Sequence, residues 1–133
     1  MGQNITKAVK EMVADANKEI TTIPISDALN LVDSPNHVIV DLRDIRELQR
    51  GGKIPGAFSC PRGMLEFWID PASPYHKEIF NQDKTYVFYC ASAWRSALST
   101  KLVQDMGLAP VAHIEGGFLA WTKADGPIEE ISK

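Results

Sequence analysis

Hydrophobic positions near the start of the chain recur with the spacing of one face of a helix. They follow an i, i+3, i+4, i+7 pattern: Ile5, Ala8, Val9, Met12, Val13, Ala16 and Ile20. Lysine and glutamate lie between them, so we expect residues 1–20 to form an amphipathic helix that packs on residues 21–133. Residues 21–24 interrupt this pattern, and a short second helix is expected to begin at Ser26, whose hydroxyl can cap its first turn.

Three later segments have the composition of strands that are buried on both faces. They are nearly continuous apolar runs at residues 37–41, 85–89 and 111–114. Runs of this kind are typical of parallel sheets, whose two faces are both covered by helices. A shorter strand is expected at residues 57–59.

Helical segments lie between these runs. Asp44 and Glu47 have the spacing of a capping box, and a helix that follows the second run can end at Gly107. Three shorter helical pieces are expected at residues 62–68, 75–80 and 118–123. Because strands and helices alternate, we expect an α/β fold with a mainly parallel central sheet flanked by helices.

The composition narrows the range of functions. Of the 133 residues, 44% are hydrophobic and 23% are charged, which suits one globular domain rather than a disordered chain. The net charge of −3 argues against a nucleic-acid partner. The sequence shows neither a signal-peptide pattern nor a run of about 18 apolar residues that would span a membrane. We therefore expect a cytoplasmic protein with no membrane partner.

The two cysteines are too few for a disulfide scaffold, and in a reducing compartment both carry thiols. Cys60 precedes Pro61 after a short strand, and a structural role is favoured for it. Cys90 lies where a buried strand passes into a helix, the position at which open α/β sheets bind ligands. A loop of small residues there can direct several N–H groups at one point, and the helix start adds positive partial charge. Arg95 adds a cation, so all three effects favour the Cys90 thiolate over the thiol.

Three stretches of the sequence carry family signatures. They are residues 38–43 with Glu47 and residues 52–57, the loop at residues 90–95, and residues 114–121. In this order they are similar to the N-terminal signature, the active-site loop and the closing motif of single-domain rhodaneses, a family of sulfurtransferases. In the loop, four residues separate Cys90 from Arg95, as in the sulfurtransferases. The resemblance covers about residues 20–126 and implies the rhodanese-like three-layer fold.

The resemblance also implies sulfur transfer through a persulfide on Cys90. The thiolate would take the outer sulfur of a small donor such as thiosulfate, and cyanide or a thiol, including a protein thiol, would accept it. Neither a metal nor an organic cofactor is implied. Arg95 would brace the loop or bind the charged end of the donor. The N–H groups of the loop would hold the persulfide, and they belong to Ala91, Ser92, Ala93, Trp94, Arg95 and Ser96.

Other residues in or near these motifs are expected to support the loop or to affect its conformation and its choice of donor. Asp41, Arg43 and Glu47 are interpreted as supporting residues rather than reacting groups. Ala93 occupies a position where many family members have glycine, and a positive φ there would cost an alanine about 1–2 kcal/mol. The neutral loop and its Trp94 favour a less polar donor or a protein partner over thiosulfate.

Two other functions stay open from the sequence. One is a weakly catalytic interaction module, such as a persulfide carrier or sensor that docks on a partner protein. The other is a phosphatase or arsenate reductase, although the related phosphatases have one more residue between cysteine and arginine, which widens the loop for a tetrahedral phosphate. His37, His76 and His113 lie far from Cys90 in the sequence and lack metal-ligand spacing, so neither a Cys-His hydrolase nor a zinc site is favoured.

Overall fold

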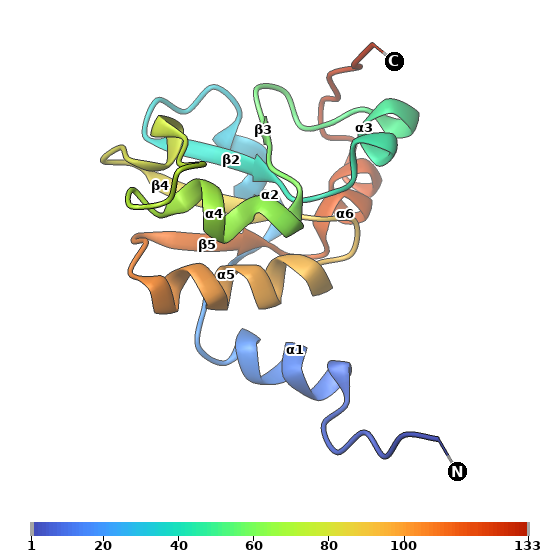
Figure 1. The fold of residues 1–133 in the computed structure, drawn as a ribbon. Helices are drawn as coiled ribbons and strands as arrows, with labels where there is room; N and C mark the ends of the chain where they lie inside the picture. The colour runs from blue at the N-terminus through green and yellow to red at the C-terminus, as the bar shows by residue number, and fades with distance from the viewer. Residues whose placement is uncertain (1, 133) are drawn as a thin grey trace.

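The computed structural model describes residues 2–132 and contains one parallel sheet that is covered on both sides by helices (Figure 1). Its strand order is β1-β5-β4-β2-β3, and every neighbouring pair of strands is parallel. The strands are β1 (Thr21–Ile23), β2 (His37–Asp41), β3 (Phe58–Ser59), β4 (Thr85–Tyr89) and β5 (Val111–Ile114). The strands expected from the apolar runs and the short strand before Cys60 are therefore confirmed.

The central strands are apolar along their whole length because both of their faces are buried. Val40 and Phe88 point to one side of the sheet, whereas Ile39 and Val87 point to the other. These four side chains are between 0% and 7% exposed. An alternating strand with one polar face would leave one of these two cores incomplete.

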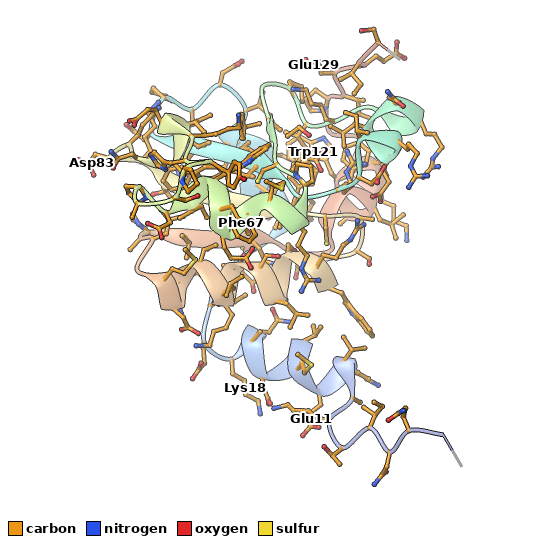
Figure 2. All side chains as sticks on the ribbon, viewed as in Figure 1. Glu11, Lys18, Phe67, Asp83, Trp121 and Glu129 are labelled. Carbon is orange, nitrogen blue, oxygen red and sulfur yellow. The ribbon has the colours of Figure 1, made fainter. Side chains whose placement is uncertain are left out.

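Two pairs of helices complete the three layers. One core lies beneath α4 and α5, and the other lies beneath α2 and α6, which contributes the fully buried Trp121 (labelled in Figure 2). This arrangement confirms the expected three-layer α/β fold class. The helices are α1 (Val9–Asn17), α2 (Ile25–Ala28), α3 (Ile45–Gly51), α4 (Leu65–Ile69), α5 (Trp94–Met106) and α6 (Gly117–Lys123). Short 3-10 turns are η1 (Leu29–Leu31), η2 (Arg62–Met64) and η3 (Glu78–Phe80).

Local capping signals predicted some helix ends well. Asp44 accepts a hydrogen bond from the Arg46 N–H and Glu47 accepts one from the Asp44 N–H, so the capping box at the start of α3 is confirmed. Gly107 ends α5 in the left-handed conformation, as expected. The prediction that Ser26 caps α2 was wrong, because α2 begins after Pro24 and Ser26 lies inside it.

Other boundaries differ from the sequence expectations. The first helix is shorter than predicted, and residues 21–23 form the edge strand β1 rather than a simple break. The reason is tertiary, since β1 obtains its hydrogen bonds by pairing with β5, which is distant in sequence. Of the helical piece expected at 75–80, only the turn η3 forms, and the piece at 62–68 is divided between η2 and α4.

The first helix lies outside α5, on the side away from the sheet (Figure 1). Val13 and Ala16 of α1 are buried against Ala97 of α5. The Gln104 side chain of α5 donates a hydrogen bond of 2.8 Å to the Glu19 carbonyl just after α1. Within residues 2–132, no helix is long and apolar enough to cross a bilayer.

Asp41, at the end of β2, forms a buried ion pair with Arg43. Asp41 is 0% exposed and Arg43 is 3% exposed, and the closest approach of Arg43 Nη2 to Asp41 Oδ2 is 2.7 Å. Arg43 Nη2 also donates to the Gly52 carbonyl at 2.8 Å, and the Tyr89 hydroxyl donates to Asp41. Burial, with the Asp41 charge, raises the pKa of Tyr89 above its ordinary value, which keeps the hydroxyl protonated as a donor. The guanidinium lies 4.2 Å from the centre of the Phe118 ring.

This buried pair predicts a large effect from one substitution. Arg43→Ala should lower the free energy of unfolding by about 3–5 kcal/mol, because it leaves the buried Asp41 carboxylate without its cation. Urea unfolding followed by circular dichroism measures the change. Arg46→Ala is the control, since Arg46 pairs with Asp44 at the surface and its loss should barely move the urea midpoint. Equal midpoints for the two variants would contradict this account.

Candidate active site

The candidate site lies at the carboxyl end of the central strand β4. Residues 90–93 follow this strand directly and lead into the first turn of α5. The carboxyl ends of all five parallel strands meet at this edge of the sheet, so segments that are distant in sequence surround the loop. Both cysteines carry free thiols and both are buried, Cys90 with an exposure of 1% and Cys60 with 0%.

The sulfur of Cys90 caps the start of α5. The N-cap residue is Ala93, which has no side-chain oxygen to accept a hydrogen bond from the first turn. Instead, the Ser96 N–H donates to Cys90 Sγ at 3.3 Å. The first N–H groups of a helix have no partner inside the helix and carry its positive partial charge. The helix start therefore directs positive partial charge toward this sulfur.

Ala93 bends the loop back on itself. Its φ of 73° and ψ of 0° lie in the left-handed region, so the strain expected for an alanine at this position is present. Ser92 and Trp94 are exposed on the outer side of the loop, and Trp94 is 47% exposed. The loop thus presents one hydroxyl and one indole to solvent above a buried sulfur.

Arg95 is held by a bidentate ion pair. Its Nη1 and Nη2 atoms each donate a hydrogen bond of 2.9 Å to one carboxylate oxygen of Glu47. These hydrogen bonds lower the pKa of Glu47 and raise that of Arg95, so both groups are charged at neutral pH. Because Glu47 also belongs to the capping box of α3, the pair fixes the α5 loop to the neighbouring helix. Cys90 also contributes to the raised pKa of Arg95. Whether Arg95 braces the loop or binds the donor stays a prediction.

The closing motif, residues 114–121, forms hydrogen bonds with the backbone of the loop. The N–H groups of Phe118 and Leu119, in the first turn of α6, donate to the carbonyls of Cys90 and Ala91 at 2.8 and 3.0 Å. Gly117 permits this close approach, since its φ is 62° and a Cβ there would lie 2.5 Å from the Cys90 carbonyl oxygen. The loop carbonyls are therefore occupied by α6.

The other predicted supporting residues are Asp41 and Arg43. Both contact Tyr89, the residue before Cys90 in the chain, and are joined to the loop through it. Cys60 contacts the same region through its backbone N–H, which donates to the Asp41 carbonyl at 2.9 Å. Burial raises the pKa of the Cys60 thiol to about 12, so this thiol is protonated and unreactive at neutral pH.

His113 is a neighbour that the sequence interpretation missed. It lies on β5 and its Nδ1 is 2.8 Å from the hydroxyl of Ser96, the residue whose N–H contacts Cys90. Burial lowers the pKa of His113 to about 4. The signal in the sequence was a histidine inside an otherwise apolar strand, but only the parallel pairing of β4 with β5 brings it beside the start of α5.

These observations define a three-layer parallel α/β domain with a buried cysteine in the loop that follows its central strand. A model of the rhodanese-like domain matches residues 25–124, and the chain belongs to this family. It is 28% identical over 98 residues to a sulfurtransferase from Allochromatium vinosum, with 74% of this chain and 83% of that protein covered.

Solved structures agree with this family assignment, and one of them is named for a different activity. A rhodanese-like domain protein from Staphylococcus aureus is 28% identical, with a TM-score of 0.67 over 85% of this chain and 100% of that chain. A protein of unknown function from Rhodopseudomonas palustris is 61% identical, with a TM-score of 0.94 over 97% of this chain and 99% of that chain. That protein is named a possible tyrosine phosphatase.

The strained loop residue predicts a stabilising substitution. Ala93→Gly should raise the free energy of unfolding by about 1 kcal/mol, because relief of the left-handed strain exceeds the entropy that glycine adds to the unfolded chain. Ala91→Gly in the same loop is the control, since Ala91 has an ordinary negative φ and should lose stability. Thermal unfolding of both variants tests this, and two changes of the same sign would contradict it.

Proposed function

We propose that this protein is a sulfurtransferase that carries a sulfane sulfur as a persulfide on Cys90. The observation that carries the proposal is the hydrogen bond from the Ser96 N–H to Cys90 Sγ at the start of α5. A nucleophilic cysteine needs its thiolate form, and a helix N-terminus favours that form. Membership of the rhodanese-like family supports the same assignment.

In the first step, the Cys90 thiolate attacks the outer sulfur of a donor such as thiosulfate. A sulfur–sulfur bond forms on Cys90, and the donor's own sulfur–sulfur bond breaks with its electron pair leaving on sulfite. In the second step, cyanide or a thiolate attacks the terminal sulfur of the persulfide, and the Cys90 thiolate is restored. The electrons balance within these two displacements. The N–H groups at residues 91–96 would hold the charge of the persulfide.

Three features favour sulfur transfer over phosphate-ester hydrolysis. Four residues separate Cys90 from Arg95, one fewer than in the phosphatases of similar fold. Ser96 occupies the position where the longer phosphatase loop would have its arginine. Arg95 is paired with Glu47 through both of its terminal nitrogens, whereas a phosphatase would use such an arginine on the substrate oxygens. Cys90 is also only 1% exposed. A terminal sulfane sulfur reaches such a residue more easily than a phosphorus surrounded by oxygens.

The surface of the loop bears on the choice of donor. Residues 91–93 are uncharged, and the adjacent Trp94 is half-exposed. A doubly charged donor such as thiosulfate gains little from this surface, whereas an organic persulfide or a protein thiol can contact the indole. A role as a persulfide carrier that delivers sulfur to a partner protein uses the same chemistry with a slower small-molecule turnover.

Intact mass spectrometry tests the proposed intermediate. Reductant-free protein incubated with thiosulfate, or with a small thiol persulfide, should gain one sulfur atom that cyanide then removes. Cys90→Ser should gain none, because it lacks the nucleophile. Cys60→Ala should gain sulfur as the unmodified protein does, because Cys60 is buried and protonated.

Hydrolysis of p-nitrophenyl phosphate tests the competing activity in the same preparations. We expect no turnover above that of Cys90→Ser. Cys90-dependent phosphate release without any gain of sulfur would replace the sulfurtransferase proposal with the phosphatase one. Sulfur uptake from a thiol persulfide but not from thiosulfate would support the carrier role.

A further inference from the structure

His113 is hydrogen-bonded at both ring nitrogens although it is only 2% exposed. Its Nδ1 lies 2.8 Å from Ser96 Oγ, on the side of the ring that faces α5. Its Nε2 lies 3.0 Å from Asn17 Oδ1 and 3.2 Å from Thr22 Oγ1, on the side that faces the surface. One side chain therefore connects the first helix and the edge strand with the start of α5.

The direction of these hydrogen bonds follows from their chemistry. Burial lowers the pKa of His113 to about 4, so the ring is neutral and carries one hydrogen at neutral pH. Asn17 Oδ1 can only accept, so this hydrogen is on Nε2. Nδ1 is then an acceptor and takes the hydroxyl hydrogen of Ser96. The rotamer of Ser96 is fixed by this hydrogen bond.

Ser96 thus has two contacts with different roles. Its hydroxyl is held by His113, and its backbone N–H donates to Cys90 Sγ at 3.3 Å. We propose that His113 is a positioning residue that holds Ser96, and through Ser96 the sulfur of Cys90, in the reactive arrangement. This inference rests on the proposed role of Cys90 as the nucleophile. His113 does not touch the reacting atoms and acts only through its neighbour.

The inference also assigns a role to the elements before the family domain. Asn17 ends α1 and Thr22 lies on β1, and both precede residue 25, where the match to the family begins. Both contact Nε2 of His113, and Asn17 Oδ1, which can only accept, places the ring hydrogen there. Burial of Val13 and Ala16 against α5 holds Asn17 within reach of the ring.

The alkylation rate of Cys90 with iodoacetamide tests this without any sulfur donor. His113→Leu and Ser96→Ala should each slow alkylation about tenfold, because each removes the hydrogen bond that fixes Ser96. The double variant should be no slower than either single variant, since both changes remove the same contact. His113→Asn should restore most of the rate, because its amide oxygen can accept from Ser96 where Nδ1 now does.

Ser99→Ala is the matched control for the loss of a buried serine hydroxyl. Ser99 lies on the same helix, and its hydroxyl has no hydrogen-bond partner within residues 2–132, so its alkylation rate should not change. Multiplying effects in the double variant, or an unchanged rate in both His113→Leu and Ser96→Ala, would overturn the inference. If these variants behave as expected while the unmodified protein takes up no sulfur, the positioning role holds and the proposed function fails.

Discussion

The contact between the N-terminal turn of α5 and the sulfur of Cys90 determines how the rest of the site is built. A helix start leaves N–H groups without partners, and Ala93 offers no side chain to satisfy them. The Ser96 N–H turns to the sulfur instead, which requires the chain to fold back within three residues of β4. The left-handed Ala93 is the local consequence of that reversal. The positive end of the helix dipole is thereby directed at the sulfur of Cys90.

The loop is held from three sides by contacts that differ in kind. Glu47 binds Arg95 through a charged pair, and His113 binds Ser96 through a neutral hydrogen bond in a buried setting. The first turn of α6 binds the loop carbonyls, with Gly117 allowing the approach. Beneath these contacts, the Asp41–Arg43 pair neutralises its own charges and orders the end of the neighbouring strand. Arg95 and Glu47 are therefore paired with each other, and the Ser96 N–H donates to the sulfur.

Two different activities are named among the similar proteins. A relative from Allochromatium vinosum is named a sulfurtransferase, and the Rhodopseudomonas palustris protein is named a possible tyrosine phosphatase. Overall similarity cannot distinguish them, because both chemistries use a cysteine at the same place in this type of fold. Contacts at the loop are more informative, since both terminal nitrogens of Arg95 donate to the Glu47 carboxylate.

The sequence by itself determined the features that depend on neighbouring residues. The apolar runs of β2, β4 and β5, the capping box at Asp44 and Glu47, and the terminating Gly107 were all predicted correctly, because burial on both faces and capping leave local patterns. Cys90 and its four-residue spacing to Arg95 identified the loop because they are close together in the sequence. Only the tertiary structure decided that residues 21–23 form a strand, since an edge strand of three residues exists through its pairing with β5. It also decided that His113 lies beside Ser96, because two strands of a parallel sheet meet in space through a crossover helix that no local pattern can reveal.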